Sequence, residues 1–149
     1  MTPLIETSFD ATEAEAEALL DIIVEANRRN GVPSDDSDEM IIRLQHPDSG
    51  ALIGGLYAER YYGWLYVRLL AVPEVLRGQG WGTRLLEMAE ARARVCGCVG
   101  VWLDSFSFQA APFYRQRGYI EFGAIDSYPP GHQRVFFHKR LAGAAPLPL

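Results

Sequence analysis

The chain has 149 residues, 48% of them hydrophobic, and a formal net charge of −5. This length fits one domain with an ample core, and the acidic balance with scattered basic residues excludes the basic stripe of a nucleic-acid-binding protein. No apolar run approaches a membrane span and no signal peptide is recognisable, so we expect a cytoplasmic protein without a membrane partner. Cys96 and Cys98 are too close for an unstrained disulfide and too few for a zinc site, so no metal is expected.

The amino-terminal third predicts a strand, a helix and a loop. Residues 3–9 are short and mostly apolar, which favours a first strand. Residues 11–29 have apolar side chains at helical spacing, glutamates near the start and arginines near the end, so they predict an amphipathic helix capped by Asp10 or Thr12. Residues 32–39 form an acidic loop, which is either a solvated linker or a segment that faces a cationic substrate.

Three consecutive strands follow and should run antiparallel as a meander. Residues 40–46 and 51–60 alternate in the manner of strands, and the Pro-Asp-Ser-Gly segment 47–50 between them suits a hairpin turn. The third strand, residues 64–72, is the most apolar of the three and should lie at the centre of the sheet.

A glycine-rich loop comes directly after the central strand and a four-residue turn. Alternate glycines at a helix start allow close approach of a ligand, and the unpaired N–H groups of the first turn attract phosphate. The spacing fits neither the dinucleotide fingerprint nor the P-loop, and no lysine is present. The loop consists of Arg77, Gly78, Gln79, Gly80, Trp81, Gly82 and Thr83.

The carboxyl-terminal half predicts a second helix, a strand, a third helix and a strand pair. The second helix should end near Cys96, and residues 99–103 are nearly all apolar, as in a strand parallel to the central one. Ser107 can cap a helix over residues 109–117. Residues 119–125 and 134–141 predict the closing strands, and residues 142–149 a tail.

Two motifs resemble the GNAT superfamily of acyl-CoA N-acyltransferases. The first is Arg-x-x-Gly-x-Gly at Arg77, Gly80 and Gly82, similar to the family's pyrophosphate loop. The second is residues 107–119, similar to its N-x-x-A-x-x-F-Y-x-x-x-G-F/Y segment and matched at Ala110, Phe113, Tyr114, Gly118 and Tyr119. The resemblance implies an α/β (α+β) fold, with helices on both faces of a mixed, mostly antiparallel seven-stranded sheet and a splay between its two parallel central strands. It implies one domain over residues 1–141 followed by the tail.

The resemblance also implies acetyl-CoA as acyl donor. The pantetheine arm would bond to the backbone of Leu70, Ala71 and Val72, with the Leu70 amide as oxyanion donor, and the pyrophosphate to the loop Arg77 to Thr83. Tyr114 stands at the family's general-acid position, although a tyrosine packed against the sheet would give the same pattern. Further expected donor contacts are Ser107, where the family commonly has asparagine, Ala110, Phe113 and Tyr114.

The acceptor side departs from the family pattern. Tyr66 occupies the position where many members carry a glutamate base, so the candidate bases are Asp104, His132, Glu59 or a water molecule. Glu59, Tyr66 and Tyr128 are the expected substrate contacts. The main hypothesis is direct transfer to a primary amine of a small molecule in a ternary complex. The alternatives are a CoA-binding module without catalysis and acetylation of a protein amino terminus or lysine. A homodimer is common among relatives.

Overall fold

The computed structural model describes residues 1–32 and 37–143, and the chain divides into two units, residues 1–36 and 37–149. Residues 33–36 of the expected acidic loop and most of the expected tail lie outside the described residues. No described helix is long and apolar enough to cross a membrane.

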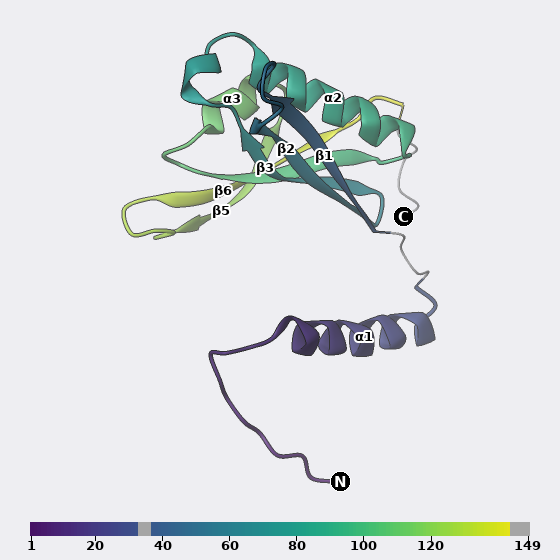
Figure 1. Cartoon of the computed structure of the whole chain (residues 1–149). Coiled ribbons are helices and arrows are strands. Elements are labelled where there is room, and N and C mark those ends of the chain that lie inside the picture. The colour runs from purple at the N-terminus through teal and green to yellow at the C-terminus, as the bar shows by residue number, and fades with distance from the viewer. Residues whose placement is uncertain (33–36, 144–149) are drawn as a thin grey trace. The chain divides into compact units, whose positions relative to one another are not determined.

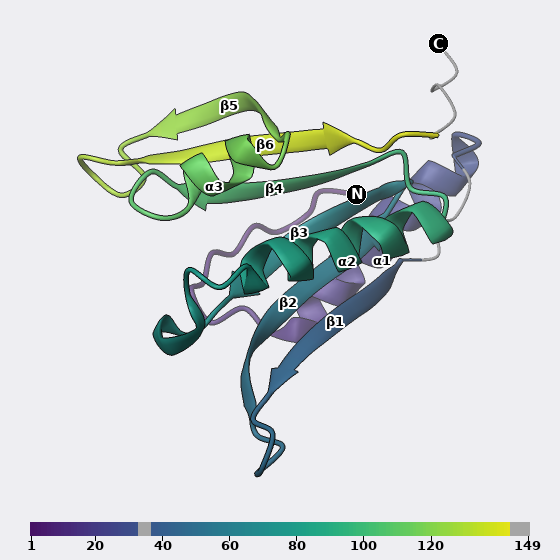
Figure 2. The ribbon, with the colours of Figure 1, turned by 90° about the horizontal axis from the view of Figure 1, so that it is seen from above.

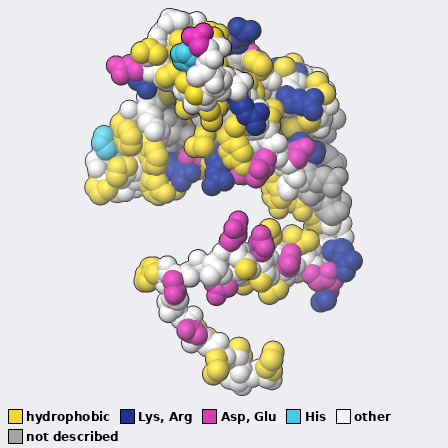
Figure 3. Space-filling model, in the orientation of Figure 1, with side chains coloured by type: hydrophobic (Ala, Val, Ile, Leu, Met, Phe, Trp, Pro, Cys, Tyr) yellow, Lys and Arg dark blue, Asp and Glu magenta, His cyan; other side chains and the backbone are white. Residues whose placement is uncertain are grey.

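The first unit contains helix α1 (Glu13–Arg29). Thr12 and Glu15 form a capping box, because the Glu15 N–H donates to the Thr12 hydroxyl at 3.2 Å and the Thr12 N–H to the Glu15 carboxylate at 2.7 Å. The first turn of α1 is acidic at Glu13 and Glu15 and its last turn is basic at Arg28 and Arg29, the order that the helix dipole favours. Acidic side chains also lie along the helix (Figure 3). The expected strand over residues 3–9 is wrong. Residues 1–12 are exposed and pair with no described strand, and composition alone forms no ladder.

The second unit is built on one mixed sheet of six strands in the order β1-β2-β3-β4-β6-β5 (Figure 1). The structure describes six strands in this sheet instead of the expected seven, because residues 3–9 form no strand. All neighbours are antiparallel except β3 and β4, which are parallel, so the predicted meander and parallel pair are confirmed. The strands are β1 (Asp38–Gln45), β2 (Leu52–Tyr61), β3 (Trp64–Ala71), β4 (Gly100–Phe106), β5 (Ile120–Asp126) and β6 (Gln133–Arg140).

Two helices of this unit, α2 (Trp81–Val95) and α3 (Ala111–Gln116), lie over the same face of the sheet (Figures 1 and 2). A single 3-10 turn, η1 (Glu74–Leu76), precedes α2. The apolar stripe of α2 is buried at Leu85, Leu86, Ala89 and Ala93, against inward-facing residues of the sheet. This core fixes the start of α2 relative to the ends of β3 and β4.

The parallel strands β3 and β4 separate halfway along their length. Their pairing runs from Trp64 opposite Gly100 to Val67 opposite Leu103 and stops there, although both strands continue (Figure 2). At the same level β3 has a bulge, because Tyr57 of β2 faces Leu69 while its neighbour Ala58 faces Val67. Arg68 is therefore an extra residue, and a bulge of this kind bends a strand and often borders an active site. The separation of the two parallel central strands that the family resemblance implies is therefore confirmed.

Candidate active site

A cleft of about 870 Å³ opens where β3 and β4 separate, and the starts of α2 and α3 complete its walls. Beyond Val67, β3 pairs with β2 alone among the described strands, so its other edge carries backbone groups without a partner in any of them. Leu70 and Val72 line the cleft at this edge. Ala71, the third residue expected there, is not among the described lining residues.

The glycine-rich loop presents backbone donors at one end of the cleft. Gly78 and Gly80 have φ angles of +72° and +84°, which side-chain-bearing residues rarely adopt, and Gly80 is the amino-terminal cap of α2. The first backbone bond of α2 runs from the Arg84 N–H to the Gly80 carbonyl at 3.0 Å. The N–H groups of Trp81, Gly82 and Thr83 therefore have no acceptor in the preceding turn, and the site suits an anion.

The start of α2 packs closely against Phe113 at this end of the cleft. A Cβ at Gly82 would lie 3.3 Å from the ring of Phe113, so only glycine leaves that ring in place. The Arg77 side chain lines the cleft, and its Nε donates to the Val72 carbonyl at 3.2 Å. Gln79 is turned back instead, with its amide donating to the Val75 carbonyl at 3.1 Å. These residues fit the diphosphate of an acyl-CoA, with Gln79 contributing no lining side chain.

Tyr114 lies in the opposite wall of the cleft on α3. The residue is 7% exposed and its ring lies edge-on to Phe113, with centroids 5.2 Å apart. The hydroxyl has no hydrogen bond to another described residue. Burial, and then the negative charge of Asp104, raise the pKa of Tyr114 to about 12. The hydroxyl is therefore protonated at neutral pH and has its donor free.

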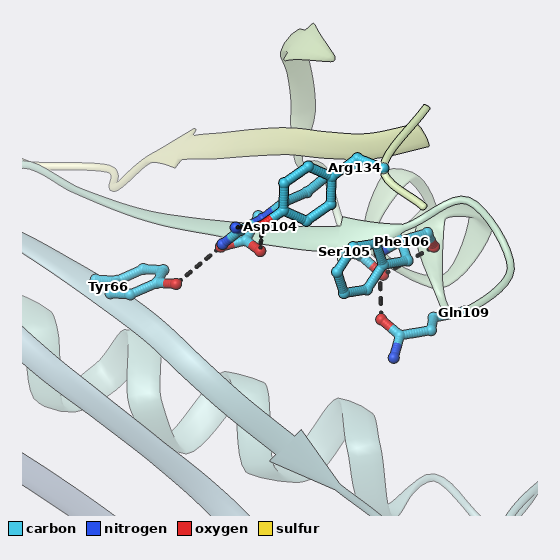
Figure 4. Close-up of polar contacts among 7 residues, drawn as sticks. Tyr66, Asp104, Ser105, Phe106, Gln109 and Arg134 are labelled. Carbon is cyan, nitrogen blue, oxygen red and sulfur yellow. Dashed lines mark hydrogen bonds and ion pairs between the residues drawn. The ribbon is translucent and has the colours of Figure 1, made fainter. Parts of the chain in front are cut away.

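Four side chains from different elements form a connected polar line beside the cleft. The Tyr66 hydroxyl of β3 donates to Asp104 Oδ1 of β4 at 2.8 Å, and Arg134 Nε of β6 donates to Asp104 Oδ2 at 2.6 Å (Figure 4). The other end of the Arg134 guanidinium donates to the Tyr128 hydroxyl at 3.2 Å. Tyr66, Asp104 and Tyr128, which the sequence analysis singled out separately, thus belong to one network.

Asp104 is the centre of this network. Its bond raises the pKa of Arg134, and burial followed by the bond to Asp104 raises the pKa of Tyr66. Both carboxylate oxygens accept a hydrogen bond, one from Tyr66 and one from Arg134, which fixes the orientation of the carboxylate. Asp104 lies on β4 two residues beyond Trp102, the register partner of Tyr66, so a carboxylate lies next to the position where the resemblance leads us to expect a glutamate.

A second pocket of about 520 Å³ lies at the amino-terminal end of β3. Its aromatic side is Tyr66 stacked on Trp102, with ring centroids 4.0 Å apart and planes 15° apart. Glu39 and Glu59 line its acidic side. Glu59 is paired with Arg68 of the bulge: a terminal nitrogen of Arg68 lies 2.9 Å from a carboxylate oxygen of Glu59. Two expected substrate contacts, Glu59 and Tyr66, therefore line this pocket instead of the cleft.

Ser107 does not have its expected structural role. The cap residue of α3 is Ala110, without a side-chain cap, and the Ser107 hydroxyl accepts from the Gln133 N–H at 3.0 Å. The predicted cap is wrong because α3 begins later than residue 109. Ser107 is also absent from the described lining of the cleft, where Ser105 lies instead, its hydroxyl accepting from the Ala110 N–H at 3.3 Å.

His132 lies on the exposed loop between β5 and β6. Its ring is edge-on to Phe108, with centroids 4.9 Å apart, and Phe108 lines the cleft. His132 itself is not among the described lining residues, so its assignment as a base stays a prediction.

Arg117 is a charged cleft residue that the sequence analysis did not predict as part of the site. It lines the cleft from the end of α3, where its Nε donates to the Thr83 hydroxyl at 2.8 Å. Helical spacing was the available signal, since Arg117 follows Tyr114 by three residues and Phe113 by four and so lies on the same side.

A cleft between two splayed parallel strands, closed by a helix start with free amides and a buried tyrosine, defines an acyl-CoA-dependent acyltransferase. Comparison with known proteins agrees, since the model of the acetyltransferase (GNAT) family matches residues 6–119. The chain belongs to this family and is an acyltransferase, and the family uses acetyl-CoA as its acyl donor.

Three relatives illustrate the similarity. An acetyltransferase of Agrobacterium fabrum is 37% identical over 133 residues, which cover 89% of this chain and 96% of the relative. The crystal structure of an acetyltransferase from Bacillus cereus is 32% identical with a TM-score of 0.78 and covers 91% of this chain and 98% of its own. A blasticidin-S acetyltransferase of Streptomyces morookaense is 45% identical over 85 residues, which cover 56% of this chain and 62% of the relative.

Proposed function

We propose that this enzyme transfers the acetyl group of acetyl-CoA directly to a primary amine of a small cationic molecule in a ternary complex. The observation that carries the proposal is the position of Tyr66. Its ring lines the acidic aromatic pocket, while its hydroxyl bonds Asp104, which lines the cleft. An amine in the pocket therefore has a polar path to the cleft. The relative named for blasticidin S supports a small-molecule acceptor.

The charge of the pocket supports a cationic acceptor. Among the described lining residues, Asp38, Glu39 and Glu59 are acidic and Arg60 is basic, and Arg60 pairs with Asp38 at 2.7 Å. The lining carboxylates outnumber the lining cations, and the stacked Tyr66 ring adds a face that attracts cations. Glu39 accepts a hydrogen bond from Tyr57, which raises the pKa of that phenol.

Five residues of the donor cleft have a chemical role in this proposal. Bound acetyl-CoA supplies an activated thioester. The Leu70 N–H, on the unpaired edge of β3, donates to the carbonyl oxygen as negative charge develops there. The Tyr114 hydroxyl faces the sulfur and donates to it as the thiol leaves. The amides of Trp81, Gly82 and Thr83 hold the diphosphate, which fixes the distance between the loop and the thioester.

Asp104 positions the amine in this proposal, and water carries its proton away. Both Asp104 oxygens accept bonds, from Tyr66 and Arg134, and the carboxylate held in this way orients the amine. Glu59 is held by Arg68, which favours a binding role for that residue over proton removal. The Tyr128 hydroxyl accepts a hydrogen bond from Arg134 at the far end of the network and so helps to hold that side chain in place.

The test is thiol release from acetyl-CoA across a panel of neutral amines, monocations, polyamines, amino sugars and peptides. We expect release with cationic small molecules, and a several-fold higher KM for them in Glu39→Gln but not in Glu87→Gln. Glu87 is exposed on α2 and outside both pockets, so its variant removes the same charge elsewhere. Labelled acetyl-CoA in a lysate should label metabolites. Label found only on proteins would replace the proposal by protein acetylation.

A further inference from the structure

Arg117 is held rigidly at the diphosphate end of the cleft. Its Nε donates to the Thr83 hydroxyl at 2.8 Å, and its guanidinium carbon lies 4.9 Å from the centre of the Phe113 ring. The side chain is half-buried. A planar guanidinium fixed by a ring below it and a hydroxyl beside it has little freedom left to lose when it binds a ligand.

The charge of Arg117 is not neutralised within the described protein. No described Asp or Glu lies within ion-pair distance of it, whereas the neighbouring Arg115 pairs with Glu121 at 2.8 Å. Arg134 and Arg68, which also line or border the cleft, are paired with Asp104 and Glu59. A half-buried cation without a counterion is unfavourable unless a ligand supplies the anion.

The hydrogen-bonding capacity left on Arg117 matches a phosphate. With Nε bonded to Thr83, the four N–H groups on its two terminal nitrogens remain, in the fork that suits two phosphate oxygens. Thr83 is the third residue of α2, so this fork lies beside the free amides of the helix start. Arg77 lines the same cleft from the loop.

We infer that Arg117 binds the diphosphate of the acyl donor as a second cation besides Arg77, with Thr83 and Phe113 as its positioning residues. The inference concerns the donor side alone, so it stands or falls independently of the amine that the enzyme acetylates.

The experiment measures binding of CoA and of 3′-dephospho-CoA to the full chain by calorimetry, without any amine. Arg117→Gln should raise Kd for both ligands alike, by about tenfold to hundredfold, as expected for a charge-assisted bond. Its Kd should depend less on salt than that of the unmodified protein. Arg117→Lys keeps the charge but loses the fork, and should recover only part of the affinity.

The matched control is Arg115→Gln, which removes the same charge two residues away, outside the described lining of the cleft, and should leave Kd unchanged. Thr83→Val is the second variant, because it keeps Arg117 and frees its Nε; it should weaken both ligands several-fold. An Arg117→Gln effect confined to CoA would overturn the inference in favour of the 3′-phosphate. Equal losses in Arg115→Gln, or no loss in either Arg117 variant, would also overturn it.

Discussion

Tyr114→Phe removes a single oxygen from the proposed chemistry and leaves the core packing in place. The Tyr114 ring contacts Phe113, Tyr119 and Phe137, with centroids 5.2, 6.0 and 6.0 Å away, and phenylalanine keeps all three contacts. The hydroxyl bonds no described residue, so its loss leaves no partner unsatisfied. We expect the free energy of unfolding to change by less than about 1 kcal/mol.

The size of the catalytic effect follows from the pKa of the phenol. At about 12, the pKa of Tyr114 lies roughly 3.5 units above the value near 8.5 of an ordinary thiol, which makes complete proton transfer to the sulfur uphill by about 5 kcal/mol. Tyr114 therefore acts mainly as a hydrogen-bond donor to the developing charge. Donors of this kind and general acids contribute about a hundredfold or more, so we expect a turnover loss near a hundredfold.

The assay is single-turnover thiol release with a saturating amine, with CoA affinity measured in parallel. Tyr114→Phe should lower the single-turnover rate near a hundredfold and leave the Kd of CoA within about twofold. In the pH–rate profile of the unmodified enzyme, ionisation of Tyr114 should cause no change of rate below about pH 11. A single-turnover rate within threefold of the unmodified enzyme, with chemistry rate-limiting, would refute the assignment of Tyr114.

Three further predictions concern stability, each measured by urea unfolding. Gly55→Ala should lower the free energy of unfolding by at least about 2 kcal/mol, because Gly55 has a φ of +144° and a Cβ there would meet a β1 carbonyl. Gly123→Ala on β5 is the control: its Cβ would have open space, so it should lower the free energy of unfolding far less. Asp104→Asn should lower the free energy of unfolding by about 1–3 kcal/mol, because it leaves Arg134 unpaired. Adding Arg134→Gln should recover part of this loss. A double variant whose loss equals the sum of the two single losses would contradict the pairing. The raised pKa of Tyr114 means that the folded state holds its proton more tightly, so stability is full below pH 10 and falls by up to about 3 kcal/mol as pH rises through 12; Tyr114→Phe should reduce this fall.

The sequence predicted the donor side well because glycine spacing and helix periodicity are local properties. The loop needs positive φ at Gly78 and Gly80, and both glycines are visible in the sequence. The parallel pairing of β3 with β4 follows from the apolar composition of residues 99–103 and from a helical crossover too long for a hairpin. The same reasoning put Tyr114 on the helix that borders the cleft.

What the sequence did not predict depends on contacts between distant segments. The bulge at Arg68 is a mismatch between two strands and has no signature in either strand alone. Ser107 satisfies the pattern of a helix cap, but the competing bond from the Gln133 N–H takes its hydroxyl. Residues 3–9 have the composition of a strand, yet a strand requires a partner edge, which local sequence does not specify.

The tyrosine at position 66 has a different meaning once the pairing of β3 with β4 is known. In the sequence it counted against catalysis, because the family commonly has a glutamate there. In register, Tyr66 faces Trp102, and Asp104 is the next residue of β4 on that side, within 2.8 Å of the Tyr66 hydroxyl. A phenol on one strand and a carboxylate on the next are thus joined by a hydrogen bond at the position where the family commonly has a glutamate, and Arg134 bonds the other carboxylate oxygen. In the proposed reaction, a cationic amine leaves the acidic pocket past the Tyr66 ring and reaches the Asp104 carboxylate at the cleft, an order suited to guiding it toward the thioester.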